Sequence, residues 1–236
     1  MANTIETIEC HTFHPRYLGS DSFVLDIGAN HGQFTRAITT RFGCRCVAVE
    51  PAPGPFASIQ EGPLVQKMQF AVADRTGTMQ LHLAAESDAS SMVRRSGAHV
   101  ETIDVPTLSL ADLMARLGNP RVDLLKVDTE GAEIAMLAAA PDDLLQRIMQ
   151  ITIEFHDFCG ITPASEVATA LDRLAGLGFQ SVRMSGIGHQ DTWIVNQRAL
   201  GIGTAEVRYV RHVVRNWAGL GRVARRTLVK LRPATV

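Results

Sequence analysis

The stretch FVLDIGANHG, residues 23–32, decides the fold of this chain. It opens with a mostly apolar run that has the length of a buried strand, and a turn containing Gly28 and Gly32 follows. Residues 33–40 then have helical character. This order of strand, glycine turn and helix is typical of a sheet built mainly from parallel strands with crossover helices.

The rest of the chain continues this alternation of short β-rich runs and helical patterns. The further strands that we expect are residues 46–50, 68–73, 122–127, 149–155, 179–184 and 192–196. The further helices that we expect are residues 55–60, 107–117, 132–140 and 162–177. A turn at 74–77 is expected to join the third strand to 78–84 as an inserted β-hairpin, and the last two strands to pair antiparallel. The predicted fold class is α/β, with a doubly wound, mostly parallel sheet.

Length and composition are those of one globular domain. The chain has 236 residues, 46% of them hydrophobic, which is enough to bury a full core. A net charge of −1 argues against nucleic-acid binding over a large surface, which needs a basic footprint. The four cysteines include no CxxC pair, and no apolar run reaches the roughly 20 residues of a membrane-spanning helix. We expect a cytoplasmic protein with an N-terminal extension (1–20), a main domain (21–200) and a basic amphipathic C-terminal segment (201–236).

The C-terminal segment has a charge pattern of its own. Residues 206–232 contain eight Lys or Arg residues and one acid, Glu206. Val207, Val210, Val214 and Trp217 recur at helical spacing, with the basic residues largely on the other side. Three interpretations stay open: peripheral contact with an anionic membrane at its inner surface, contact with an acidic partner, or packing as an ordinary terminal helix. In the first case we expect a lipid-linked sugar as substrate.

The glycine turn is the first candidate binding site. Gly28 and Gly32 allow tight turning and close approach of a ligand, and the helix that follows offers free N–H groups. The dinucleotide pattern G-x-G-x-x-G is absent because Asn30 and Gln33 occupy its later positions. A phosphate-binding P-loop is excluded because no Gly-Lys-Ser/Thr follows. The alternative is a turn of small residues that binds nothing.

Glu50 ends the second strand about 20 residues after the glycine turn. Adjacent strand ends in a doubly wound sheet converge on one crevice, where a carboxylate can accept both hydroxyls of a ribose. The alternative for Glu50 is a solvated acid at a strand end. Together with Asp26 and Gly28, it favours a nucleoside-binding crevice.

Polar residues also gather at the end of the fourth strand. Lys126, Asp128 and Glu130 alternate, so the pleat would direct them to one side while the strand lasts. A lysine in an otherwise apolar strand needs a partner, because an unpaired buried charge is costly. Asp128 or Glu154 could supply it. The alternative is a salt-bridged strand end without chemistry.

The fifth strand ends in Glu154 and His156, which share one face. A histidine at a strand mouth, oriented by a carboxylate, is a candidate general base because its pKa lies near working pH. A purely structural histidine is the alternative. Glu154, His156, Asp157 and Asp128 could also ligate a divalent metal, but their spacing is not specific and we do not favour it.

These segments together resemble the FkbM-type family, a branch of the class I S-adenosylmethionine-dependent methyltransferases. The matching stretches are residues 24–32, 49–51, 71–77, 90–91, 124–133 and 153–156, with Lys-Val-Asp-Thr-Glu-Gly-Ala-Glu (126–133) the most specific. The resemblance implies a seven-stranded, Rossmann-like sheet with an antiparallel last strand. It also implies S-adenosylmethionine as cofactor and O-methylation of a hydroxyl, commonly on a sugar or a natural product.

The resemblance also implies roles for individual residues. The residues expected to bind the cofactor are Asp26, Gly28, Asn30, Gly32, Phe34, Glu50, which would hold the ribose, and Ala73 and Asp74, which would lie beside the adenine. The residues expected to contact the acceptor are Ser90 and Ser91, in a loop over the site at 85–99, and Asp157. His156 is the first choice as base and Asp128 the second. Lys126, Glu130 and Glu154 would orient groups or neutralise charge.

Two rival functions stay open at this point. A nucleic-acid methyltransferase would use the basic C-terminal segment, but the acidic main domain and the missing Asn/Asp-Pro-Pro-aromatic tetrad argue against it. A non-catalytic binding module that has kept the fold is the other rival.

Overall fold

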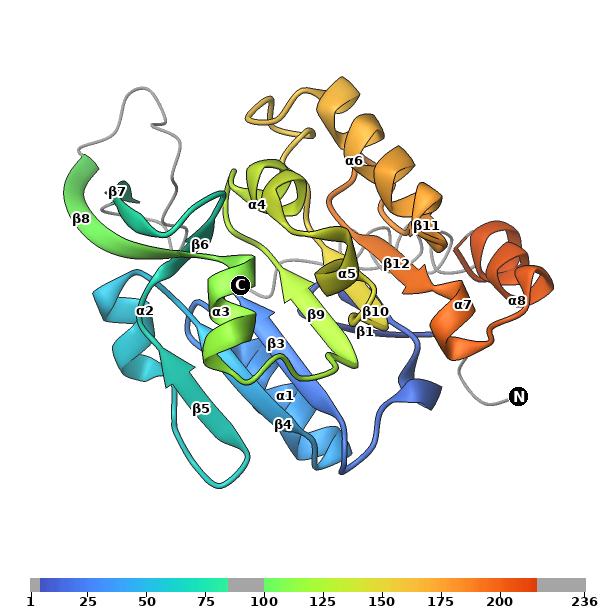
Figure 1. Cartoon of the computed structure of the whole chain (residues 1–236), viewed down its shortest axis with the longest axis horizontal. Helices are drawn as coiled ribbons and strands as arrows, with labels where there is room; N and C mark the ends of the chain where they lie inside the picture. The colour runs from blue at the N-terminus through green and yellow to red at the C-terminus, as the bar shows by residue number, and fades with distance from the viewer. Residues whose placement is uncertain (1–4, 85–99, 216–236) are drawn as a thin grey trace, which may run out of the picture.

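The computed structural model describes residues 5–84 and 100–215, and a seven-stranded sheet runs through its middle (Figure 1). Across the sheet its strands are β11 (Phe179–Arg183), β12 (Thr192–Asn196), β10 (Gln150–Ile153), β9 (Leu124–Val127), β3 (Phe23–Ile27), β4 (Arg45–Val49) and β5 (Val65–Met68). β12 runs antiparallel to both neighbours, and every pairing from β10 to β5 is parallel. The predicted α/β fold class, with its antiparallel closing pair, is confirmed.

The chain enters the sheet at its centre. β3 comes first in the sheet, the next two strands are added on one side, and the remaining strands are added on the other, beginning with β9 beside β3. The strand order therefore reverses between β3 and β9. In open α/β sheets, ligands bind in the crevice at the carboxyl ends of the strands at such a reversal.

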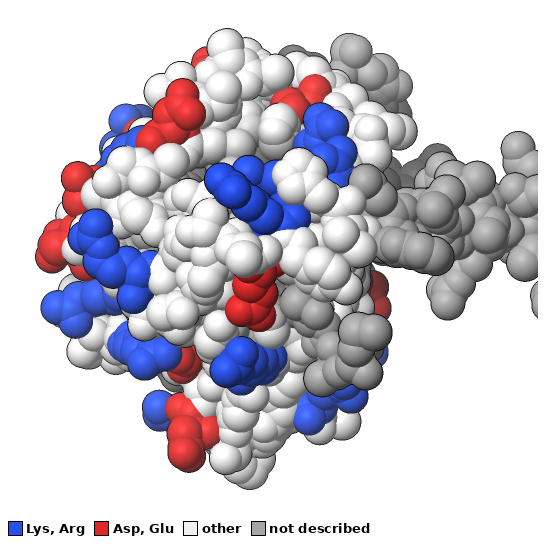
Figure 2. Space-filling model, turned by 90° about the vertical axis from the view of Figure 1, so that its right-hand side faces the viewer, with Lys and Arg blue, Asp and Glu red and all other residues white. Residues whose placement is uncertain are grey.

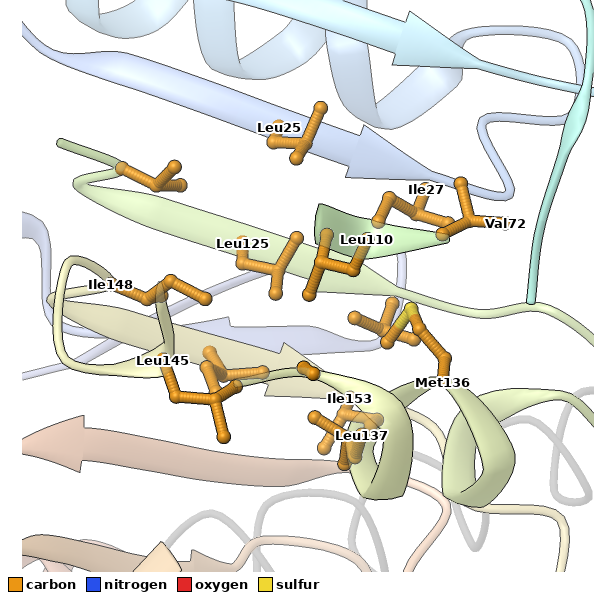
Figure 3. Packing of buried hydrophobic residues seen from close by; sticks show 14 of the residues in the cluster. Leu25, Ile27, Val72, Leu110, Leu125, Met136, Leu137, Leu145, Ile148 and Ile153 are labelled. Carbon is orange, nitrogen blue, oxygen red and sulfur yellow. The ribbon is translucent and has the colours of Figure 1, made fainter. Parts of the chain in front are cut away.

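Helices cover both faces of this sheet. They are α1 (Gln33–Phe42), α2 (Pro53–Ser58), α3 (Leu110–Arg116), α4 (Glu133–Ala139), α5 (Asp142–Leu145), α6 (Ala164–Gly176), α7 (Gln197–Leu200) and α8 (Thr204–Tyr209). Because side chains alternate along a strand, Leu25 and Ile27 face α3 and α4, whereas Val24 faces α1. Figure 3 shows the first packing layer, in which Leu110 of α3 and Met136 of α4 lie over the strands.

A second, three-stranded sheet corrects two expectations. Residues 68–73 are not one strand, because β5 ends at Met68 and the chain leaves the main sheet before β6 (Ala71–Ala73). β6 pairs parallel with β8 (Val100–Ser109), which pairs antiparallel with β7 (Gly77–Ala84). The predicted hairpin between 68–73 and 78–84 is therefore wrong. Periodicity shows that residues are extended, but it does not show which partner they pair with.

The helix expected from residue 107 begins later. Residues 107–109 still pair with β6, Thr107 also pairs with β7, and α3 begins at Leu110. Ser109 caps this helix, since its hydroxyl accepts a hydrogen bond from Asp112 N at 3.0 Å. The predicted loop at 85–99 lies outside the described residues.

The described part of the N-terminal extension is folded onto the main sheet. β1 (Glu6–Ile8) and β2 (His11–Phe13) pair antiparallel, and a 3-10 turn (Pro15–Tyr17) follows. The Thr12 hydroxyl donates to Asp191 Oδ2 at 2.6 Å, and His14 N donates to Gln150 Oε1 at 2.9 Å. These bonds hold β2 against β10 and the turn before β12.

The C-terminal segment is described as far as residue 215. α8 continues into a π-helical turn (Val210–Val214), and Val207 and Val210 are buried against β11 and β12. These two valines pack as in an ordinary terminal helix, while Trp217 and the remaining basic residues lie outside the described part. On the face that carries α7 and α8, acidic and basic side chains are mixed (Figure 2). Within the described ranges, no helix has the length and apolarity needed to cross a bilayer.

Candidate active site

Four neighbouring strands end in register. Pairing aligns Ile27, Val49, Val127 and Ile153 across β3, β4, β9 and β10. The residues that come next at this edge are Gly28, Glu50, Asp128 and Glu154. Residues at equivalent positions of parallel strands point to the same side, so one edge collects the groups that the sequence places far apart.

The glycine turn is shaped by the backbone beside it. Gly28 has φ 75°, and a Cβ there would lie 1.7 Å from the carbonyl oxygen of Asp128. Gly28 N and Ala29 N both donate to Val49 O, at 2.9 and 3.0 Å. Only glycine fits this conformation at this distance. The glycine therefore lets β3 and β9 approach closely at the point where the crevice opens.

Glu50 is 6% exposed and is held by the turn. Its carboxylate accepts from Asn30 N at 2.8 Å and from Ala52 N at 2.9 Å. Burial raises the pKa of Glu50, although these two donors oppose the rise. Each carboxylate oxygen keeps a second lone pair for a ligand. Asn30 Oδ1 is also buried and has no hydrogen-bond partner among the described residues.

An open cavity lies between Glu50 and Asp128. Its lining residues are Ile27, Gly28, Val49, Glu50, Pro51, Phe70, Ala71, Val72, Leu81, Asp128 and Thr129. The cavity is therefore apolar in its middle and acidic at both ends. Such a shape suits a flat apolar ring with polar groups on either side.

The residues expected to bind the cofactor are only partly brought together here. Gly28 and Glu50 line the cavity, and Asn30 lies beside Glu50. Ala73 and Asp74 do not line it, and their place is taken by residues 70–72. The other three lie elsewhere: Asp26 under the turn, Gly32 against Ile59, and Phe34 on the buried face of α1.

Lys126 is buried and joins β9 to the glycine turn. Its ammonium lies 3.2 Å from Asp26 Oδ1 and 4.0 Å from Asp128 Oδ2, and it donates to the carbonyl of Gly28. Burial would lower the pKa of Lys126, but these two carboxylates raise it above its ordinary value. The expected partner Asp128 is present, whereas Glu154 forms no ion pair with this lysine. Asp26 is nearer to Lys126 than either of them, although the sequence does not single it out as the partner.

His156 lies at the centre of a cluster of carboxylates. Its side chain is 2% exposed. Its Nε2 faces three carboxylates, at 3.4 Å from Glu130 Oε2, 3.9 Å from Asp128 Oδ1 and 3.9 Å from Glu154 Oε1. Its Nδ1 lies 3.1 Å from Glu133 Oε1. The cluster contains four of the predicted catalytic residues, and the fifth, Lys126, adjoins it through Asp128.

Glu133 organises this cluster, although it is not among the site residues predicted from the sequence. It is fully buried in the first turn of α4. Besides His156, its Oε1 accepts from Thr129 N, the Thr129 hydroxyl and Gly131 N, at 3.1, 3.1 and 3.0 Å. The sequence feature that could have predicted this role of Glu133 is its place at the end of the most specific motif (126–133), immediately before the apolar residues of a helix.

The protonation states follow from these contacts. Burial disfavours an imidazolium, yet the hydrogen bonds to Glu130 and Glu133 raise the pKa of His156 to about 11. Burial would raise the pKa of Asp128, but Lys126 and His11 lower it to about 2. Burial and the nearby Asp128 raise the pKa of Glu154 to about 7. In this arrangement His156 already holds a proton, which is unfavourable for its predicted role as base.

His11 reaches the same cluster from the N-terminal strand β2. Its side chain is 3% exposed, and its Nε2 lies 3.8 Å from Asp128 Oδ2. Its Nδ1 has no hydrogen-bond partner among the described residues. β2 and Asp128 are more than a hundred residues apart in the sequence. No local pattern therefore predicts that His11 contacts Asp128.

Asp157 turns away from the cluster. Its carboxylate accepts from His189 N at 2.8 Å and lies 2.8 Å from His189 Nδ1. It therefore holds the loop between β11 and β12. Of the four residues considered as metal ligands, Asp128, Glu154 and His156 come together and Asp157 does not. Ser90 and Ser91 lie outside the described residues.

Comparison with known proteins gives a consistent result. A family model described as the methyltransferase FkbM domain matches residues 26–181. The chain is 27% identical over 191 residues to the 31-O-demethyl-FK506 methyltransferase FkbM of Streptomyces tacrolimicus, covering 66% of this chain and 74% of that protein. It is 29% identical over 144 residues to the 2-O-methyltransferase NoeI of Sinorhizobium fredii, covering 52% and 59%.

The fold has a counterpart among solved structures. The crystal structure of methyltransferase FkbM from Methylobacillus flagellatus superposes with a TM-score of 0.50 at 11% identity. The match covers 75% of this chain and 44% of that one. At this identity the likeness supports the fold alone.

Proposed function

This chain belongs to the FkbM methyltransferase domain family, and we propose that it transfers the methyl group of S-adenosylmethionine to a hydroxyl of a sugar or natural-product acceptor. The observation that carries the proposal is that Gly28, Glu50 and Asp128 line one cavity. Glu50 would accept the ribose hydroxyls. Residues 70–72 would pack against the adenine, and the sulfonium would lie toward Asp128.

The acceptor would bind at the carboxylate cluster around His156. Methyl transfer is an in-line displacement, so the acceptor oxygen must face the methyl carbon on the side opposite the sulfur. The O–C bond forms while the C–S bond breaks, which leaves S-adenosylhomocysteine with a neutral sulfur. The hydroxyl loses its proton in this step, and a neighbouring base must receive it.

We assign that proton to Glu154, in place of His156, the base expected from the sequence. Glu133 engages His156 Nδ1, and carboxylates surround Nε2. Asp128 is held between Lys126 and His11. Glu154 lies beside them with its side chain 15% exposed, and no described residue holds its carboxylate by a hydrogen bond.

The names of two relatives support oxygen as the methylated atom. One is named for O-demethyl-FK506 and the other as a 2-O-methyltransferase. A lipid-linked acceptor would follow if the basic segment 206–232 contacts an anionic membrane. Removal of 216–236, which spares the buried Val207 and Val210, should then abolish binding to vesicles that contain phosphatidylserine. Unchanged binding would exclude this version of the acceptor.

Calorimetry with S-adenosylmethionine tests the cofactor site. We expect Glu50→Ala to weaken binding by about ten- to a hundredfold, because it removes hydrogen bonds to a carboxylate worth about 1.5–3 kcal/mol. Glu166→Ala, on the exposed face of α6, is the matched control and should bind like the unmodified protein. No binding heat from the unmodified protein would refute the proposed cofactor.

Release of S-adenosylhomocysteine tests the reaction. With a panel of hydroxylated sugars and macrolides as acceptors, the unmodified protein should release it, whereas Glu154→Gln should bind the cofactor normally and turn over slowly. Cofactor binding without turnover on any acceptor would favour the rival interpretation, a binding module that has kept the fold.

A further inference from the structure

We propose that this site binds a divalent metal ion, ligated by Asp128 Oδ1, Glu130 Oε2 and His156 Nε2. These three atoms come from two adjacent strand ends, and all lie within 4.8 Å of one another. Nε2 is 3.4 Å from the Glu130 oxygen and 3.9 Å from the Asp128 oxygen. Ligand bonds of about 2.1 Å place neighbouring ligand atoms about 3 to 4.2 Å apart, so these spacings accommodate an ion.

The imidazole of His156 is oriented as a metal ligand would be. Nδ1 meets the fully buried carboxylate of Glu133 at 3.1 Å, and that carboxylate is itself fixed by Thr129 and Gly131. With Nδ1 as donor to Glu133, Nε2 faces Asp128 and Glu130, and a bound ion would replace the proton on Nε2. Metal-ligating histidines almost always have such a carboxylate or carbonyl behind them.

A separate observation also supports a cation at this position. Asp128 Oδ1 is buried and has no hydrogen-bond partner among the described residues. The other oxygen of this carboxylate faces His11, a buried side chain whose Nδ1 is likewise unpartnered in the described part of the chain. Buried polar atoms are normally satisfied, and a cation would satisfy Asp128 Oδ1.

The surroundings suit a divalent ion in charge and access. Glu154 adds a third carboxylate on the same side of His156. The side chains of Asp128 and Glu130 are 27% and 21% exposed, so an ion can enter from solvent. One imidazole with two carboxylates fits ions between the hard and soft extremes, such as Mn²⁺.

The role of the ion rests on the proposed function, whereas its binding does not. Bound beside Glu154, the ion would hold the acceptor oxygen and lower the pKa of its hydroxyl. The proton would pass to Glu154 and the methyl group to the oxygen, as in the reaction above. His11 would then be a positioning residue that keeps the Asp128 carboxylate turned toward the ion.

Titration with Mn²⁺ tests the site directly. The full chain, stripped with a chelator and dialysed, is titrated while electron paramagnetic resonance follows the free ion. We expect one Mn²⁺ per chain. Asp128→Asn, His156→Gln and Glu133→Gln should each weaken binding by about tenfold or more. Asp172→Asn, the same change on the exposed face of α6, should leave it unchanged.

Two results would overturn the proposal: no loss of the free Mn²⁺ signal, or equal binding by Asp128→Asn and the unmodified protein. Glu130→Gln repeats the test at a partly exposed residue in case Asp128→Asn fails to fold, which circular dichroism would reveal. The titration contains neither cofactor nor acceptor. A chain that binds S-adenosylmethionine but no Mn²⁺ refutes the metal site alone, and the reverse result refutes the cofactor.

Discussion

Gly28 lies at the ends of β3 and β9, where the backbone of Asp128 leaves no room for a Cβ. We expect Gly28→Ala to lower the free energy of unfolding by about 3 kcal/mol, from overpacking and the positive φ together. Urea denaturation measures this. Gly176→Ala, in α6 with open space around it, should leave stability unchanged or raise it by up to about 1 kcal/mol. Equal effects at both positions would contradict the packing explanation.

Lys126 compensates the charge of Asp26, which is fully buried. Lys126→Met should cost about 3–5 kcal/mol of unfolding free energy, because it leaves a buried carboxylate without its cation. Adding Asp26→Asn should recover part of this loss. A double-mutant cycle by chemical denaturation measures the coupling, and additive effects would show that the pair is not coupled.

The residues of this site differ in how far the sequence could predict them. Gly28 and Glu50 follow from strand ends in register, because parallel strands bring their carboxyl ends to one edge. Glu133 and His11 do not, since each joins His156 or Asp128 through a tertiary contact that no local pattern encodes. The sequence also does not show how many carboxylates surround the imidazole of His156.

At the scale of elements, β2 and the turn after it are held by a buried histidine. His14 is 3% exposed, and burial lowers its pKa below the ordinary value of 6.5, although Glu206 opposes this. The unfolded chain therefore binds a proton at a higher pH than the folded one. The stability that depends on neutral His14 is present above pH 6.5 and is lost as the pH falls through the lowered pKa.

Denaturation curves between pH 7 and 5 test this effect. His14→Gln should flatten the pH dependence of the unfolding free energy relative to the unmodified protein. His82→Gln, on β7 and remote from the N-terminal strands, is the control and should keep the original slope. An unchanged slope in His14→Gln would assign the pH dependence to other groups.

The elements themselves were predictable where an apolar run crosses the core. The glycine turn, α1 and the antiparallel last pair lie close to their expected positions. The parallel strands β3, β4, β9 and β10 do so because buried parallel strands are apolar throughout. The exceptions are the strands of the second sheet, β6, β7 and β8. β6 has only three residues, and β7 pairs with β8 rather than with the nearer β6, so this pairing depends on tertiary contacts rather than on composition.

At the scale of the whole molecule, cofactor binding should appear as stability. At a hundred times its dissociation constant, a ligand that binds only the folded state adds about 2.7 kcal/mol. For a domain of this size we expect S-adenosylmethionine to raise the unfolding temperature by roughly 5–10 °C. Glu50→Ala at the same concentration should gain about half of this or less in a thermal scan, whereas Glu166→Ala should gain all of it. Equal shifts in the unfolding temperature of Glu50→Ala and the unmodified protein would show that Glu50 does not contribute to cofactor binding.

The strand that carries His11 lies before residue 26, where the match to the family model begins. The glycine turn and the strand ends that would face the nucleoside lie within the matched residues. His11, which lies 3.8 Å from Asp128 on the proposed acceptor side, comes from the preceding strand β2. Grafting the first twenty residues of a relative onto this domain should therefore alter the preferred acceptor while leaving affinity for S-adenosylmethionine untouched. Selectivity for the acceptor would then depend on the N-terminal residues, and cofactor binding on the matched domain.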